Sequence, residues 1–445
     1  MNTSRDNFGS RFGVLVALTG SAVGLGNLWR FPYLMGENGG AAFIIIYLIF
    51  VFVLCLPIMY SEFVLGRRSQ TNVFGAFKVL APGSKWSIVG LFGVLASISI
   101  LAFYCVVGGW SIEYLVKALC FDFTRQGTVN YETMFSDFVS SPVKPVVYHV
   151  IFLVMTAAIC LGGVKKGIEK FAKIMMPLLF VMVIIIAIRS LTLEGASAGI
   201  SYMFKPDFSK INSGTLLAAL GQAFFSLSLG CGTIMTYGSY VSKDENIMKC
   251  SVITSFSDTL FAIIAGCAIM PAVFAFGISP SEGPGLVFIT LPRIFAQLPL
   301  GGIIAILFFL TLLLAAVTSS ISLLEVVVTY LLEEFKIKRK TAVFLTFFLI
   351  LILGTLCSLS QGVLSDIKLF GMTFFDFFDY VSSNILMPVG GLLIVLFVGW
   401  RLGKANLFDE LTNSGKLKVP QWLLEITFFI IRFLAPVTIA VIMIF

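Results

Sequence analysis

The sequence has little charge and almost no histidine. Charged residues make up 12% of the 445 positions, about half the share of soluble proteins, whereas hydrophobic residues make up 58%. The single histidine, His149, and the lack of cysteine pairs at metal-ligand spacing leave little for zinc chemistry or histidine-based acid–base catalysis. The eight cysteines lie in or beside hydrophobic stretches, which is typical of buried apolar residues and not of a disulfide framework. With no nucleophile–base pair, phosphate loop or metal motif, we do not expect an enzyme.

What the sequence has instead is long apolar runs, and its mean hydropathy is +1.01. A run of about 20 apolar residues can cross a bilayer as a helix, so the sequence predicts an all-α, polytopic membrane protein surrounded by membrane lipids. Eleven spans are expected, near residues 11–35, 41–66, 86–119, 143–161, 167–190, 213–240, 245–276, 300–332, 341–358, 371–402 and 421–445.

Basic residues indicate the orientation of these spans. With the N-terminus inside, 20 of the 30 Lys and Arg residues fall in the predicted inner loops, as the positive-inside rule requires. The N-terminus is therefore expected in the cytoplasm and, after eleven spans, the C-terminus outside, in the inner (plasma) membrane of the cell. The net charge of +7 lies in short loops and does not indicate a nucleic-acid partner. The sequence does not specify an oligomeric state.

Two of the predicted spans are interrupted by glycine and serine. The first contains GSAVGLG at 20–26, and the sixth contains GQAFFSLSLGCG at 221–232. These segments stand five helices apart, which predicts two inverted five-helix repeats, 11–190 and 213–402, followed by an extra C-terminal helix at 421–445. Paired broken helices of this kind indicate a transporter site between repeats. The alternative is close packing of intact helices through small residues.

The N-terminal stretch GSAVGLGNLWRFPYLMGENGGAAF (20–43) resembles the signature of the neurotransmitter:sodium symporter family. The resemblance continues through PIMYSEFVLGR (57–67), GQAFFSLSLGCG (221–232), GPGLVFITLP (283–292) and TSS (318–320), and it covers nearly the whole chain. Family members with twelve helices have one more than this chain, which resembles the shorter, eleven-helix bacterial amino-acid transporters. The resemblance implies import of a small amino acid by alternating access, coupled to sodium.

The resemblance also implies a substrate site at the two breaks. Unwound backbone exposes N–H groups that favour an anion, and the amides of Leu25 and Gly26 with the Tyr104 hydroxyl would hold the substrate carboxylate. Cys231 stands where the leucine transporter has Phe, which opens volume and suggests a larger hydrophobic or aromatic substrate. The implied substrate-binding residues are Ala22, Leu25, Gly26, Ile100, Tyr104, Phe225, Ser226, Ser228, Cys231, Ser319 and Leu323.

Two sodium sites follow from the same resemblance, and oxygen ligands suit so hard a cation. The implied first site consists of Ala22, Asn27, Ser226 and Asp258 together with the substrate carboxylate. The implied second site consists of Gly20, Val23, Ala315, Thr318 and Ser319. For the hydroxyls of 318–320 the alternative is a bond back to the preceding turn of their own helix.

Asp258 departs from the family pattern, which usually has Asn near this position. Chloride-dependent members place Ser four residues on, where this chain has Ala262. Positions i and i+4 share a helix face, so Asp258 can supply the negative charge itself, and we expect no chloride requirement. The residues equivalent to a chloride site are Tyr47, Gln222, Ser226 and Asp258. A different register would place Ser257 at the Asn position.

Charges near helix ends are implied to form gates. Arg30 and Asp379 resemble an outer pair, whereas Arg5 and Glu333, with Tyr240 nearby, resemble an inner pair. Two alternatives to a sodium symporter stay open at this point. One is a proton-coupled amino-acid exchanger on the same scaffold, which the oxygen-rich second site argues against. The other is a substrate-gated channel or sensor, which the short inner loops and the lack of a signalling domain do not favour.

Overall fold

The computed structural model describes residues 7–124, 129–279 and 283–444, and these residues are almost entirely helical. Arg5, one of the expected gate residues, lies outside the described residues. The helices are α1 (Arg11–Ala22), α2 (Phe31–Glu37), α3 (Ala41–Ile49), α4 (Leu56–Ser69), α5 (Val73–Leu80), α6 (Ser87–Leu119), α7 (Tyr131–Ser140), α8 (Lys144–Leu161), α9 (Lys170–Leu191), α10 (Ala196–Phe204), α11 (Ser213–Ser226), α12 (Thr233–Gly238), α13 (Ile247–Ala275), α14 (Thr290–Gln297), α15 (Gly301–Glu334), α16 (Arg339–Leu359), α17 (Phe374–Tyr380), α18 (Met387–Leu396), α19 (Lys404–Leu411), α20 (Gln421–Phe429) and α21 (Ala435–Ile444).

Several of these helices join through π-helical turns into longer spans. Among the described residues, nine continuous helices are long and apolar enough to cross a membrane, and the bent pair 11–22 and 26–37 makes a tenth. The remaining predicted span is α11 followed by α12, which the non-helical residues 227–232 separate. The expected all-α, polytopic architecture with breaks in the first and sixth spans is thus confirmed, because each expected span matches a helix or a broken helix pair.

Polar residues mark where helices begin at the bundle ends. The side chain of Asn212 accepts from the Thr215 N–H at the start of α11, and Asn246 accepts from the Lys249 N–H at the start of α13. Such N-caps satisfy backbone donors that the helix itself leaves unpaired. They fix where the sixth and seventh spans enter the bundle.

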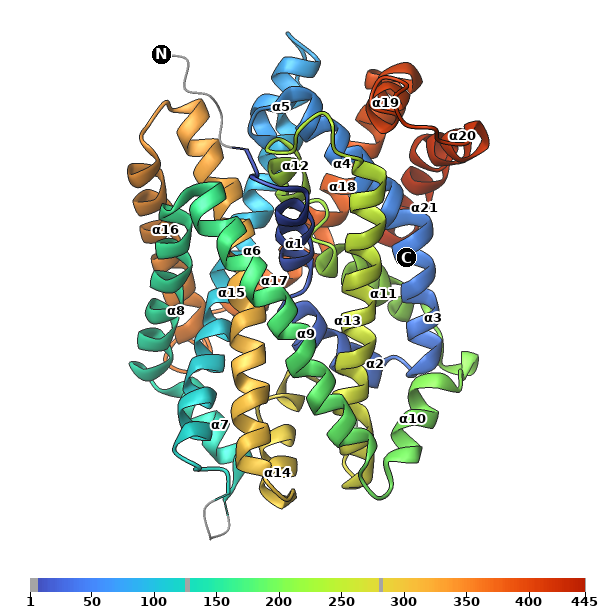
Figure 1. Ribbon diagram of the computed structural model, residues 1–445. Helices are drawn as coiled ribbons and strands as arrows, with labels where there is room; N and C mark the ends of the chain where they lie inside the picture. Colours follow the sequence, from blue (N-terminus) through green and yellow to red (C-terminus); the bar gives the residue numbers. More distant parts are fainter. Residues whose placement is uncertain (1–6, 125–128, 280–282, 445) are drawn as a thin grey trace.

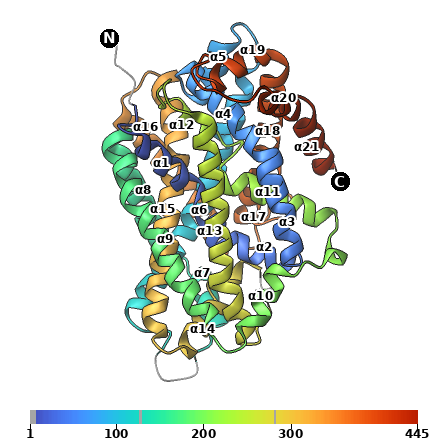
Figure 2. The same ribbon diagram turned by 45° about the vertical axis from the view of Figure 1, so that its right-hand side comes forward.

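The first span runs through the middle of the bundle. Figure 1 shows α1 surrounded by long helices, and α1 contacts α9, α13 and α15. Figures 1 and 2 place the short helices α5 and α19 together at one end of the molecule, and Figure 1 shows α7 and α14 toward the opposite end. We refer to these as the α5–α19 end and the α7–α14 end. The charge distribution predicts that the α5–α19 end faces the cytoplasm.

Candidate functional site

The first span is broken at residues 23–25. Helix α1 ends at Ala22, Val23 is extended (φ −71°, ψ 106°), and the two helical parts meet at 43°. The freed N–H groups find side-chain partners, since the Gly24 N–H donates to Oδ1 of Asn27 at 2.9 Å and the Leu25 N–H donates to the Tyr104 hydroxyl at 3.1 Å. A side chain at Gly24 would collide with Ser319 and Tyr104, so only glycine allows this approach.

The sixth span is broken at residues 227–232. Ser228, Gly230 and Gly232 all have positive φ, at 54°, 75° and 80°. Residues other than glycine rarely adopt this backbone conformation. The buried Glu62 accepts from the Gly230 N–H at 2.7 Å, and this bond stabilises the opened backbone. The Ser228 hydroxyl donates to the carbonyl of Ser21 at 2.9 Å, so the two breaks touch each other.

A buried carboxylate lies beside both breaks. Oδ1 of Asp258 accepts from Nδ2 of Asn27 at 2.8 Å, and Oδ2 accepts from the hydroxyls of Ser226 at 2.7 Å and Tyr47 at 3.3 Å. All four side chains are almost fully buried, and no Lys or Arg pairs with Asp258 in the described part of the chain. A buried carboxylate held only by neutral donors lacks a counter-charge, which a bound cation could supply.

The geometry separates the two alternative registers of α13. Asp258 is buried and bonded to Asn27, whereas Ser257 is only half-buried. Gln222, the remaining residue of the expected chloride-site set, donates from Nε2 to the carbonyl of Gly26 at 2.9 Å. Ala262 lies one turn further along α13 and is fully buried.

A second group of oxygens gathers on the other side of the first break. The carbonyl of Val23 accepts from the hydroxyls of Thr318 at 3.3 Å and Ser319 at 3.4 Å, and Thr318 also donates to the carbonyl of Ala315 at 2.8 Å. Gly20 faces the same place, because a side chain there would contact Thr318. All five expected residues of the second sodium site therefore lie together. The Thr318 hydroxyl has an acceptor in its own helix, the Ala315 carbonyl, and a second acceptor at the break, the Val23 carbonyl.

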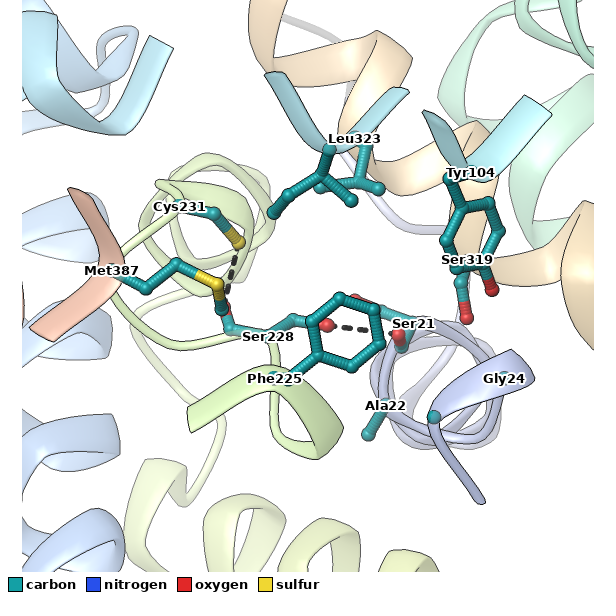
Figure 3. Close-up of a pocket in the computed structure, with 12 residues that line it drawn as sticks. Ser21, Ala22, Gly24, Tyr104, Phe225, Ser228, Cys231, Ser319, Leu323 and Met387 are labelled. Carbon is teal, nitrogen blue, oxygen red and sulfur yellow. Dashed lines mark hydrogen bonds between the residues drawn. The ribbon is translucent and has the colours of Figure 1, made fainter. Parts of the chain in front are cut away.

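A small cavity of about 20 Å³ lies between the two breaks. Figure 3 shows the Phe225 ring facing Leu323 across it, with Cys231 and Met387 at one end and Tyr104, Ser319 and Gly24 at the other. Nine of the eleven expected substrate-binding residues line it. Of the other two, Leu25 donates its N–H to the Tyr104 hydroxyl and Ser226 donates to Asp258. The expected residues that line the cavity are Ala22, Gly26, Ile100, Tyr104, Phe225, Ser228, Cys231, Ser319 and Leu323.

The cavity is too small for an amino acid in this conformation. About 10–15 Å³ by this measure holds one water, so an amino acid fits only when the lining side chains move apart. The apolar lining and the polar end at Tyr104 and Gly24 match a molecule with one hydrophobic and one charged part.

A charged pair lies next to the cavity-lining residue Phe225. Nη2 of Arg30 lies 3.8 Å from Oδ1 of Asp379, and Ser383 bridges them by accepting from Nη1 of Arg30 at 2.9 Å and donating to Asp379 at 3.0 Å. The Arg30 guanidinium also lies 4.8 Å from the centre of the Phe225 ring. Phe225 lines the cavity, so the Arg30 guanidinium packs against a ring of the cavity wall.

Two further sets of polar contacts involve Glu333 and Glu325. Glu333 accepts from the backbone and side-chain N–H groups of Asn72 at 2.7 and 3.0 Å. The Tyr240 hydroxyl donates to Oε1 of Glu325 at 2.8 Å, and Arg339 donates to the same oxygen at 2.9 Å. Glu325 is fully buried, and the Arg339 guanidinium, 2.5 Å away, balances its charge.

Sequence reasoning missed several contributors. Met387 lines the cavity, Ser383 bridges the Arg30–Asp379 pair, and Arg339 pairs with Glu325. Met387 belongs to an apolar run, and this pattern does not indicate which side of the helix faces the cavity. Arg339 lies among basic loop residues, where its sequence context suggests only a topology signal.

The fold and the site define a multi-pass membrane transporter rather than an enzyme. The chain matches the "Sodium:neurotransmitter symporter family" over residues 5–141 and 134–445. It therefore belongs to the sodium:neurotransmitter symporter family.

Relatives from three kinds of organism share most of its length. It is 40% identical to the uncharacterized sodium-dependent transporter YhdH of Bacillus subtilis, over 97% of this chain and 96% of the relative. It is 30% identical to the uncharacterized sodium-dependent transporter MJ1319 of Methanocaldococcus jannaschii, over 94% and 86%. It is 29% identical to the sodium-dependent serotonin transporter of Drosophila melanogaster, over 89% and 68%.

A solved structure shares the whole fold. The crystal structure of MhsT in complex with L-phenylalanine is 44% identical, with a TM-score of 0.94 over 99% of both chains. The expected family, a sodium-dependent membrane transporter, is thus confirmed.

Proposed function

We propose that the protein is a chloride-independent symporter that imports a hydrophobic or aromatic amino acid with sodium by alternating access. The observation that carries this proposal is the Asp258 carboxylate, which is buried beside both helix breaks and, within the described part of the chain, bonded only to neutral donors. An intramembrane ionised group is costly and marks a functional site. A sodium ion beside it would provide the missing positive charge.

The first sodium site would consist of the Ala22 carbonyl, Asn27, Ser226 and Asp258. The substrate carboxylate would complete it, with the Leu25 and Gly26 amides and the Tyr104 hydroxyl as its other partners. Because each charge would neutralise the other in a closed cavity, sodium and substrate would bind with positive coupling. The Leu25 N–H already donates to Tyr104, so these donors converge where the carboxylate is expected.

The second sodium site would use Gly20, Val23, Ala315, Thr318 and Ser319. It joins the first span to α15, since Val23 lies at the break and Thr318 on α15. An ion here would hold the first span against α15 without touching the substrate.

Chloride independence rests on the same carboxylate. The hydroxyls of Tyr47 and Ser226, which could otherwise hold an anion, both donate to Asp258. A fixed negative charge already occupies the place where chloride would add one.

Alternating access would use the two polar closures in turn. Arg30 and Asp379 would close the outer side, and Arg5 and Glu333, with Tyr240, the inner side. The repeats 11–190 and 213–402 would move against each other, with the N-terminus in the cytoplasm and the C-terminus outside. The Arg30 contact with Phe225 supports this coupling, because opening the outer pair would free a ring that lines the cavity.

The substrate class follows from the cavity lining. Ile100, Phe225, Leu323 and Met387 are apolar, and Cys231 leaves space for a ring. The similar transporter MhsT was solved with L-phenylalanine. No Asp or Glu is among the described residues that line the cavity, so a basic side chain would find no partner in this lining.

Competition for uptake tests the substrate class. Proteoliposomes with an inward sodium gradient would be given labelled tyrosine with unlabelled leucine, tryptophan, lysine or GABA. We expect leucine and tryptophan to inhibit and lysine and GABA to have no effect. Inhibition by lysine or GABA alone would contradict the hydrophobic pocket.

A further inference from the structure

A lipid-facing groove runs between α8 and the start of α9, at the α5–α19 end of the molecule. Its volume is about 320 Å³, and its floor includes Ala158, Ile159, Phe171 and Ile174. Ala158 and Ile174 are exposed, and they lie on two helical segments, Lys144–Leu161 and Val164–Leu191, that are long and apolar enough to cross a membrane. The groove therefore presents an apolar trough to the hydrocarbon of the membrane.

Two glycines create this trough. Gly162 follows α8 and Gly167 lies in the π-helical turn Val164–Glu169 that precedes α9, and both line the groove. A side chain at Gly167 would collide with the carbonyl of Ile159. The two chain segments thus pack backbone against backbone, which leaves an open channel at the surface.

Lysine side chains edge the groove at its cytoplasmic end. Lys166 and Lys170 line it and are exposed, and neither forms an ion pair within the described ranges. The acid of this segment, Glu169, is engaged elsewhere, by Lys173 at 2.6 Å and the Gly9 N–H at 2.6 Å. Two positive charges beside an apolar trough are therefore uncompensated.

We propose that this groove binds an anionic diacyl phospholipid. Lys166 and Lys170 hold the headgroup phosphate, and an acyl chain lies along Ala158 and Ile174. Basic pockets between spans on the cytoplasmic side suit acidic headgroups. A free phosphate ion would gain nothing from the apolar floor, and a neutral lipid would gain nothing from the lysines.

The groove shares a wall with the proposed second sodium site. Phe171 lines both the groove and a small buried cavity that reaches Gly20 and Thr318. A lipid packed on one face of this ring restricts its movement on the other. The consequence, a sodium dependence that changes with lipid, rests on the proposed function, whereas lipid binding itself does not.

Native mass spectrometry of the full-length protein in detergent tests the binding. The protein would be titrated with phosphatidylglycerol or phosphatidylcholine, and bound lipids counted. We expect saturable binding of phosphatidylglycerol alone, weakened about 30-fold in K166Q/K170Q, from about 1 kcal/mol for each lysine. The matched control K338Q/K340Q removes two exposed lysines from the same end of the molecule and should bind as wild type does.

A second variant separates the groove from surface charge in general. Ala158→Phe keeps every lysine but fills the floor, and we expect it to lose phosphatidylglycerol binding as well. Full binding by Ala158→Phe, or equal losses in K166Q/K170Q and the control, would overturn the proposal. A third result would also overturn it: a dimer mass in place of lipid adducts, with the dimer lost in K166Q/K170Q. The groove would then hold a second copy of the chain.

Discussion

Replacing Asp258 by asparagine would remove the negative charge at the proposed first sodium site with little change of shape. A cation about 4 Å from a carboxylate gains about 4 kcal/mol at an effective dielectric constant of about 20, which corresponds to about 700-fold in affinity. This value is the full Coulomb gain, so it bounds the loss in sodium affinity from above. We expect the sodium concentration for half-maximal tyrosine uptake to rise at least tenfold.

The same substitution would change the response to chloride. Asp258 accepts on both oxygens, from Asn27 on one side and from Ser226 and Tyr47 on the other. An asparagine accepts on one side only, so donors become available to an anion. We expect wild-type uptake to be the same in chloride and in gluconate, and uptake by Asp258→Asn to be restored in part by chloride alone.

Proteoliposome uptake over a sodium series, in chloride and in gluconate buffer, measures both effects. Asp366→Asn is the matched control, since Asp366 is exposed in the loop after α16, and it should behave as wild type. An Asp258→Asn variant with less than a threefold change in sodium dependence and no chloride response would refute the reasoning. So would wild-type uptake that fails without chloride.

Three further predictions concern other parts of the site. Cys231→Phe should fill the cavity and reduce tyrosine relative to leucine uptake by about 10- to 200-fold, measured as the ratio of uptake rates. Thr318→Val should raise the sodium requirement at least tenfold in the same assay, while Thr311→Val on the same helix, whose hydroxyl bonds to its own turn, should not. Glu325→Gln should leave the Arg339 charge without its partner and lower stability by about 3 kcal/mol, seen as a lower thermal unfolding midpoint; an unchanged midpoint would contradict a structural role for this pair.

The spans and the two helix breaks could be predicted from the sequence, because hydrophobic length and interrupted helices are local signals. The break at 227–232 follows from glycine and serine spacing, and the structure places it against the break at 23–25 through the Ser228–Ser21 bond. Asp258 could be selected from the sequence as a candidate site residue because an acid inside an apolar run is costly, and the structure shows that it is buried beside Asn27. What places it next to Asn27 is the packing of α13 on the first span.

The sequence could not predict contacts that depend on how helices face each other. Glu325 lies within the hydrophobic part of α15, and its partner Arg339 lies 14 residues later at the start of α16, among several other basic residues. The charge pattern therefore leaves the pairing open. Met387 lines the cavity directly after the π-helical turn Val381–Leu386. Such turns shift a helix face by a fraction of a turn and leave no clear mark in hydropathy.

Coupling to sodium is the central claim, and an exchange of driving ions tests it most directly. Labelled tyrosine uptake would be measured in one proteoliposome preparation under an inward sodium gradient, an inward proton gradient, or neither. We expect accumulation above the external concentration under the sodium gradient alone. Accumulation driven by protons without sodium would contradict the two sodium sites and favour a proton-coupled exchanger.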